Sequence, residues 1–342
     1  MLQLRLHAFE LQLRETFTIS RRSFDRQASL VVALHDAEGN VGYGEATHNP
    51  YYPNTEIDYQ IQRLEALRTR IETFPLQTPT ELWEDLAPRL ADCPFALCAI
   101  DVAAHDLCAR RAGLPLYAYW AWEKRTQPIS SYTLSIAPIE TMIQSMRAWE
   151  WPTYKIKLGR APDLDIIRQL RAHSSSPFRV DVNGAWTAER GLAYAPELAR
   201  LGVEFIEQPL AAEDWVGMKK FYAASPLPLF ADESCRGIDD LELCREHFHG
   251  INIKLMKCGG LSPALRMIER ARELELGVMV GCMTESTVGI SAIAQLLPRI
   301  DFVDMDGPLF LAQDIATGVA LTREGVIFAE VPGTGAELLV AP

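Results

Sequence analysis

Two lysines stand two residues apart in the segment "YKIK", as Lys155 and Lys157. Because side chains alternate between the two faces of an extended strand, both lysines point in the same direction. An isolated pair of this kind is typical of a half-exposed strand whose lysines are solvated. A lysine acts as a general base only when burial and neighbouring cations lower its pKa from about 10.4 toward about 7 to 8. The residues that follow in the chain decide between these two interpretations.

Acidic side chains end three later segments that read as strands. Asp181 ends "FRVD", Glu207 ends "VEFIE" and Asp232 follows "PLFA". Each acid taken alone is also a suitable N-cap or turn residue for the segment that follows. Three converging carboxylates, however, repel one another by about 4 kcal/mol per pair at ~4 Å and a dielectric constant near ~20, unless a cation neutralises them. Oxygen ligands favour Mg²⁺ over a softer metal, so we predict a Mg²⁺ site formed by Asp181, Glu207 and Asp232.

A second pair of lysines, Lys254 and Lys257, is predicted to end the strand-like segment "INIKLMK". If Lys157 and Lys254 lie on opposite sides of a substrate carboxylate, one can remove the proton from the adjacent carbon and the other can return a proton to the opposite face. We expect Lys155, Lys257 and the metal ion to lower the pKa values of these bases. The expected reaction is inversion of a stereocentre through an enediolate.

Eight strand-like segments, beginning with "SSYTLSI" and ending with "DFVDMDGP", can bring these side chains together. Amphipathic helical stretches separate most of them, which is the pattern of parallel strands joined by crossover helices. Eight such units favour a (β/α) barrel, and the alternative is a doubly wound sheet. In a barrel the carboxyl ends of all strands meet at one rim, where barrel enzymes carry their catalytic residues.

The N-terminal part of the chain has a different pattern. Strands are predicted over residues 2–20 and 29–46, with a turn at 36–40, and helices over 56–73, 79–90 and 94–113. We therefore predict an α/β fold with two units. Residues 126–319 form a TIM-like barrel that carries the site, and residues 1–125 form an α+β capping domain, which the C-terminal tail from about residue 320 to 342 joins.

Charge and composition narrow the choice of partners. The 342 residues include 33 Lys and Arg and 45 Asp and Glu, a formal net charge of −12. Because no basic run offsets this charge, we expect neither nucleic acid nor a membrane surface as a partner. No apolar run approaches the length of a membrane span, and the N-terminus lacks the apolar core of a signal peptide. Seven cysteines without a C-x-x-C pair predict free thiols in a cytoplasmic protein. The sequence leaves open whether the protein forms a homo-oligomer.

The motifs "KIK", "DVNGAW", "EQP", "ADES", "INIKLMKCGG" and "DMDGP" occur in this order. Together they resemble the enolase superfamily, muconate-lactonizing subgroup, and in particular its dipeptide epimerases. The resemblance implies the modified TIM-like barrel of the enolase type, with Lys157 and Lys254 as the acid/base pair. It also implies that Lys155 binds the substrate carboxylate and that the three acids hold Mg²⁺.

The same resemblance implies a dipeptide substrate, such as L-Ala-D/L-Glu, that is inverted at the α carbon of its C-terminal residue. Asp304 and Asp306 of "DMD" would bind the α-ammonium group, since two carboxylates attract a cation. Thr133 and Cys282 would line the substrate or, alternatively, only pack in the barrel. Arg22, in the loop "TFTISRRSFDR", would hold a glutamate side chain, because a guanidinium pairs bidentately with a carboxylate.

Two alternatives stay open at this point. One is another enzyme of the subgroup, an o-succinylbenzoate synthase or a cycloisomerase, whose substrates carry no ammonium group for Asp304 and Asp306. The other is a structural use of the scaffold without catalysis, against which the complete set of bases and metal ligands argues.

Overall fold

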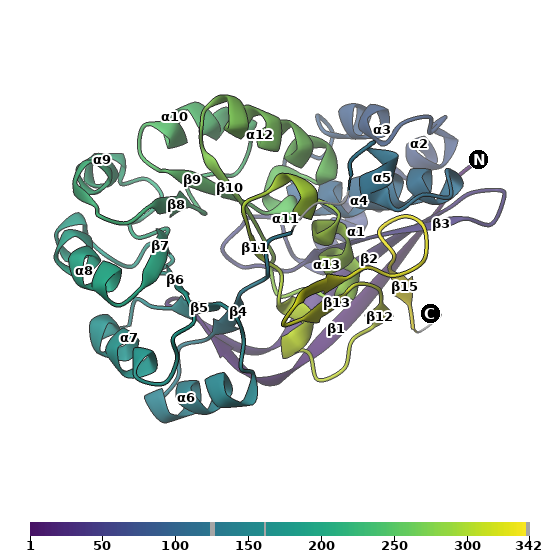
Figure 1. Cartoon of the computed structure of the whole chain (residues 1–342). Coiled ribbons are helices and arrows are strands. Elements are labelled where there is room, and N and C mark those ends of the chain that lie inside the picture. The colour runs from purple at the N-terminus through teal and green to yellow at the C-terminus, as the bar shows by residue number, and fades with distance from the viewer. Residues whose placement is uncertain (124–126, 161, 340–342) are drawn as a thin grey trace.

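The computed structural model describes residues 1–123, 127–160 and 162–339 (Figure 1). The chain begins with a three-stranded antiparallel sheet of β1 (Gln3–Thr18), β2 (Ser23–His35) and β3 (Val41–Thr47). Asp36 closes the β2–β3 turn, since its Oδ1 accepts hydrogen bonds from the backbone N–H groups of Glu38 and Asn40, each at 2.9 Å. The predicted hairpin with a turn at 36–40 is therefore confirmed, although β2 begins six residues earlier than the predicted strand.

Helices follow the sheet, and one of them is almost entirely buried. They are α1 (Ile57–Glu65), α2 (Arg68–Thr73), α3 (Pro79–Leu86), α4 (Pro94–Arg111) and α5 (Leu116–Tyr119). The predicted helix over 56–73 is in fact two helices. Helix α4 is buried from Phe95 to Ala109, and its buried polar side chains are Asp101, His105 and Asp106. It packs closely on β3, where a Cβ atom at Gly44 would lie 2.1 Å from the Ala99 carbonyl oxygen.

Eight parallel strands form the second part of the fold, in the order of the chain (Figure 1). They are β4 (Tyr132–Leu134), β5 (Tyr154–Lys157), β6 (Phe178–Asp181), β7 (Val203–Glu207), β8 (Leu229–Ala231), β9 (Gly250–Ile253), β10 (Gly277–Gly281) and β11 (Phe302–Asp304). The edge strands meet where the Ser131 N–H donates to the Val303 carbonyl oxygen at 3.4 Å. The predicted TIM-like barrel is confirmed.

Helices cover the outside of the barrel and join its strands. They are α6 (Ile139–Ala148), α7 (Asp163–Arg171), α8 (Ala188–Arg200), α9 (Trp215–Ala224), α10 (Leu241–Arg245), α12 (Leu261–Glu273) and α13 (Thr287–Ala294). The short helix α11 (Leu255–Cys258) follows β9 directly. The carboxyl end of "INIKLMK" is thus helical, so the prediction that Lys257 ends a strand is wrong.

Aromatic side chains fill the amino-terminal half of the barrel. Phe205, Phe230 and Met279 form a separate buried cluster, with Phe302 packed against it. Side chains two residues apart in a strand point to the same face. Glu207 therefore lies one layer above Phe205, and Asp304 lies one layer above Phe302. The apolar layer therefore closes the barrel below a layer of charged side chains.

The C-terminal segment returns toward the first helices. It contains the short helix η3 (Gly307–Phe310) and strands β12 (Ala316–Thr317), β13 (Ala320–Thr322), β14 (Gly325–Ile327) and β15 (Glu337–Leu338). Thr334 N–H donates to Asp106 of α4 at 2.6 Å, and Arg110 pairs with Glu337. These contacts support the proposal that the tail belongs with the capping domain. The proposed boundary between residues 125 and 126, and the end of the tail at 342, lie outside the described residues.

Two further expectations concern the whole chain. All seven cysteines are free thiols, as predicted. In the described part of the chain no helix combines the length and the apolar character that crossing a bilayer requires.

Candidate active site

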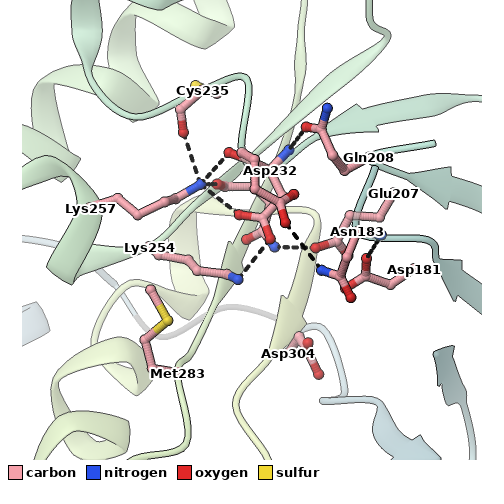
Figure 2. A network of polar contacts seen from close by, with 12 residues as sticks. Asp181, Asn183, Glu207, Gln208, Asp232, Cys235, Lys254, Lys257, Met283 and Asp304 are labelled. Carbon is pink, nitrogen blue, oxygen red and sulfur yellow. Dashed lines mark hydrogen bonds and ion pairs between the residues drawn. The ribbon is translucent and has the colours of Figure 1, made fainter. Parts of the chain in front are cut away.

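Three carboxylates converge at the carboxyl rim of the barrel, where β6, β7 and β8 end (Figure 2). Asp181 and Glu207 are the last residues of β6 and β7, and Asp232 follows β8. One carboxylate oxygen of each lies within 4.8 Å of the others, and all three residues are buried. The structure thus brings together the three acids that the sequence predicts as metal ligands.

Left-handed backbone turns hold these carboxylates in place. Asn183, two residues after Asp181, has φ of 48°, and Gln208, directly after Glu207, has φ of 35°. Such values are strained for side chains other than glycine, so contacts must compensate for them. Asn183 N–H donates to Asp181 Oδ1 at 3.0 Å, and Gln208 Oε1 accepts from Asp232 N–H at 2.9 Å. The strained turns therefore place hydrogen-bonding groups directly on the acidic cluster.

Lysines from β5 contact the cluster on one side. Lys155 Nζ lies 2.7 Å from Asp304, 2.8 Å from Glu207 and 3.2 Å from Asp181. Lys157 Nζ lies 2.5 Å from Asp181 Oδ2. Burial acts to lower the pKa of Lys155, but the surrounding carboxylates hold that pKa well above its ordinary value. Lys155 is therefore a fixed cation beneath the site.

Lys254 and Lys257 approach Asp232 from the other side, away from Asp181 in the view of Figure 2. Lys254 Nζ donates to Asp232 Oδ2 and Lys257 Nζ to Asp232 Oδ1, both at 2.7 Å. Burial acts to lower the pKa of Lys254, but the Asp232 carboxylate raises that pKa above its usual range. Lys254 is therefore held as a cation beside Asp232, and the expected lowering of its pKa by the metal ion stays a prediction.

The cluster fits a hard cation. Burial and the nearby Asp181 raise the pKa of Glu207 to about 7. Burial also acts to raise the pKa of Asp181, but Lys157 and Lys155 lower it to about 2. Glu207 Oε2 has an ion contact with Lys155, but no donor with hydrogen-bond geometry among the residues that the structure describes. A buried carboxylate oxygen in this state is a suitable ligand for Mg²⁺, which prefers oxygen donors.

Two carboxylates from the end of β11 lie beside the cluster. Asp304 accepts from Lys155 and, at 3.1 Å, from Ser131 Oγ. Asp306 Oδ2 accepts from the Thr133 backbone N–H at 2.6 Å. Burial and the neighbouring Asp304 raise the pKa of Asp306 to about 8. A cationic group bound here would relieve the repulsion between the two carboxylates.

One pocket connects the rim to the capping domain. The predicted residues that line it are Arg22, Thr133, Lys155, Lys157, Asp232, Lys254, Cys282, Asp304 and Asp306. Asp181 and Glu207 lie next to it, in contact with its lysines. Tyr51 and Tyr52 of the capping domain also line the pocket. The structure therefore brings all eleven predicted site residues to one place.

The two adjacent arginines of the capping loop have different surroundings. Arg21 donates to the Asn183 carbonyl oxygen at 2.7 Å and pairs with Glu233 at 3.0 Å. Arg22 stacks on Phe24, with 4.1 Å from the guanidinium carbon to the ring centroid. Its buried Nε has no acceptor within the described chain, and burial lowers the pKa of Arg22. Arg21 thus attaches the loop to the barrel, and Arg22 is available to a ligand.

Sequence reasoning missed how three residues support the site, although it assigned Lys257 an effect on the pKa values of the bases. Asn252 Nδ2 donates to Glu207 Oε1 at 2.8 Å, and Glu233 binds Arg21. Lys257 holds Asp232 without lining the pocket. The signal for Asn252 was its position two residues before Lys254, which places both side chains on the inner face of β9. Glu233 and Lys257 have no comparable signal, since their roles depend on turns after the strands.

Two family models match the chain. Residues 2–119 match the mandelate racemase/muconate lactonizing enzyme N-terminal domain. Residues 139–340 match the enolase C-terminal domain-like family.

Individual proteins are similar over nearly the whole length. The chain is 49% identical to an L-Ala-D/L-amino acid epimerase of Flavobacterium johnsoniae, over 99% of this chain and 100% of that protein. It is 50% identical to a protein of the same name from a Maribacter species, over 98% and 99%. The crystal structure of a dipeptide epimerase from Cytophaga hutchinsonii, complexed with Mg and D-Ala-L-Val, superimposes with a TM-score of 0.93 at 25% identity, over 99% of this chain and 96% of that one. The chain therefore belongs to the enolase superfamily, in its mandelate racemase/muconate lactonizing enzyme family.

Proposed function

We propose that the protein is a Mg²⁺-dependent dipeptide epimerase that inverts the α carbon of the C-terminal residue by a two-base 1,1-proton transfer. The observation that carries the proposal is the cluster of Asp181, Glu207 and Asp232 with a lysine on each side. The epimerases of F. johnsoniae and Maribacter, at about half of all positions identical, support the same reaction.

Lys157 and Lys254 are the proposed bases. They come from β5 and from the end of β9, which lie four strands apart in a barrel of eight, so they face the centre from opposite sides. One neutral lysine takes the α proton, and the ammonium group of the other delivers a proton to the opposite face of the enediolate. The product therefore has the inverted configuration at this carbon. The two lysines exchange roles in the reverse reaction.

The acidic residues and Lys155 supply the charge that this chemistry needs. Asp181, Glu207 and Asp232 would hold the metal ion. A bound Mg²⁺ would supply positive charge for the substrate carboxylate and would neutralise the acids that keep Lys254 protonated. Lys155, fixed by three carboxylates, would contact the same carboxylate of the substrate.

Asp304 and Asp306 point to a substrate with a free amino group. Two buried carboxylates on the β11 side of the pocket favour a cation there, and the α-ammonium group of a dipeptide provides one. Asp304 already accepts from Lys155 and Ser131, whereas Asp306 is held by a backbone N–H group. The substrates of an o-succinylbenzoate synthase or a cycloisomerase have no ammonium group for this pair to bind. The pair therefore argues against these two alternative enzymes.

The identity of the substrate residue that is inverted is inferred from Arg22 of the capping loop. Arg22 lines the pocket, has an unpartnered Nε within the described chain, and carries a charge that burial makes costly. A glutamate side chain would pair with it, so we propose L-Ala-D/L-Glu or a related L-Ala dipeptide as the substrate.

Exchange of the α proton with deuterated solvent tests the proposal. A library of dipeptides is incubated in D₂O with Mg²⁺ and, in parallel, with a chelator. We expect loss of the α-proton signal of the C-terminal residue together with appearance of the other epimer, in the Mg²⁺ samples alone. The absence of exchange for every dipeptide, or formation of an alkene instead of an epimer, would contradict the proposed function.

A further inference from the structure

A second cavity adjoins the active-site pocket. It has a volume of about 380 Å³ and lies between the end of β1, strand β4, helix α6 and η3. Phe17, Thr133 and Phe310 line both the pocket and this cavity. The two spaces therefore share one wall, to which the capping domain contributes Phe17 and the barrel contributes the other two residues.

Two aromatic rings make up most of that wall. Phe17 and Phe310 meet edge to face with 5.1 Å between ring centroids, and both side chains are half-buried. Phe310 also contacts Tyr132 on the second-cavity side, at 5.6 Å, and Phe17 contacts Phe24 on the pocket side, at 5.7 Å. Each half-buried ring therefore has open space beside it as well as these neighbours, and its truncation to alanine joins the pocket to the second cavity.

The wall stands at the amino end of the proposed substrate. The carboxylate end faces the acids of β6, β7 and β8, and the ammonium end faces Asp304 and Asp306 of β11, next to β4. Phe310 lies four residues after Asp306, in the turn of η3, and Thr133 N–H binds Asp306 directly. The side chain of the N-terminal residue therefore starts close to the wall.

The second cavity has a mixed lining: Arg14, Glu15 and Gln144 are among its polar residues, and its apolar residues can hold an apolar side chain. Tyr132, Leu134, Met142 and Trp149 line it, and Arg14 stacks over the Trp149 ring at 5.9 Å. Tyr132 and Trp149 stack on each other with centroids 5.5 Å apart. A phenyl or branched aliphatic group would bury apolar surface among these side chains at about 25 cal/mol per Å².

We propose that Phe17 and Phe310 form a partition that limits the N-terminal residue of the substrate to a small side chain, and that the cavity behind it is a latent subsite for a large apolar one. The inference rests on the proposed dipeptide epimerase function and extends it to the choice of the N-terminal residue. Removing either ring opens the subsite.

The test compares two dipeptides that have the same C-terminal residue. This residue is the one that gives the fastest turnover by the wild-type enzyme when L-Ala is the N-terminal residue. The N-terminal residue is L-Ala in one and L-Phe in the other, and kcat/KM is measured by α-proton exchange. We expect the L-Phe to L-Ala ratio to rise at least about tenfold in Phe310→Ala or Phe17→Ala, because a few methylene groups in an apolar pocket already give that discrimination. Thermal unfolding tests whether each variant is folded. Phe310→Leu is used in place of a variant that is not folded.

Trp149→Ala is the matched control, because it enlarges the second cavity without opening the wall. Its ratio should equal that of the wild type. An unchanged ratio in all folded Phe17 and Phe310 variants, or an equal rise in Trp149→Ala, overturns the partition. A wild-type enzyme that prefers L-Phe also overturns the partition but leaves the proposed function intact. A wild-type enzyme that exchanges no dipeptide contradicts the proposed function itself, and the partition with it.

Discussion

Replacing Lys257 by methionine tests how the acidic cluster is anchored. The side chain of Lys257 is 1% exposed, and its ammonium group donates to the carboxylate and the carbonyl oxygen of Asp232. The carbonyl oxygens of Cys235, at 2.8 Å, and Asn252, at 3.1 Å, also lie within hydrogen-bond distance, so the three N–H donors of the ammonium group are shared among four acceptors. Methionine keeps an unbranched side chain of similar length but removes the charge and all of these donors.

The structure sets the size of the effect. Removing one partner of a buried ion pair costs about 3 to 5 kcal/mol, because the other charge stays buried. Asp232 keeps Lys254 at 2.7 Å, which lowers that cost, but each buried carbonyl oxygen that loses its donor adds about 1 to 3 kcal/mol. We therefore expect Lys257→Met to lower the free energy of unfolding by at least about 3 kcal/mol.

Urea unfolding followed by circular dichroism measures this change. Lys220→Met is the matched control, since Lys220 is exposed on α9 and its replacement should change the free energy of unfolding by less than about 0.5 kcal/mol. If Lys257→Met lowers the free energy of unfolding by less than about 1 kcal/mol, the ammonium group is not the anchor that the contacts indicate.

Two further predictions concern specificity and pH. Arg22→Ala should lower kcat/KM for a dipeptide with a C-terminal glutamate by about 10- to 100-fold relative to one with a C-terminal leucine, since a charge-assisted hydrogen bond is lost; an unchanged preference removes the glutamate assignment. Burial lowers the pKa of His105 to about 3 from 6.5, so the unfolded chain takes up a proton below about pH 6.5 that the folded one does not. The free energy of unfolding therefore falls as the pH falls from about 6.5 toward 3, and His105→Gln should show a shallower decline in urea titrations at several pH values; parallel curves would contradict this.

Much of the site could be predicted because the period of two in a strand is simple. The common direction of Lys155 and Lys157 follows from alternation alone once the strands are assigned, whereas Asp306 lies beyond β11 and lines the pocket from the start of η3. The parallel barrel then brings the strand ends to one rim, whatever the details of the connecting loops. The structure agrees with these inferences, and the acids end or directly follow the strands that were predicted to carry them.

The parts that sequence reasoning missed depend on turns and on the sum of charges. Lys257 belongs to a helical turn after β9, so its contact with Asp232 has no periodic signal. Arg21 and Arg22 are adjacent and chemically identical, and only the packing of the loop separates an anchor from an available guanidinium. The pKa direction of Lys254 required the distance to Asp232, because burial alone predicts the opposite shift. Capping-domain contacts such as the Phe17 and Phe310 pair join residues almost 300 positions apart, which no local pattern reveals.

The central claim is that two lysines act on opposite faces of one carbon, and single-lysine variants test it most directly. The epimers of one dipeptide are incubated separately in D₂O with Lys157→Ala and with Lys254→Ala, and the α-proton signal is followed by NMR. Each variant should exchange the proton of one epimer only, the two variants should select opposite epimers, and neither should invert the carbon. Exchange of the same epimer by both variants, or inversion by either, would contradict the arrangement.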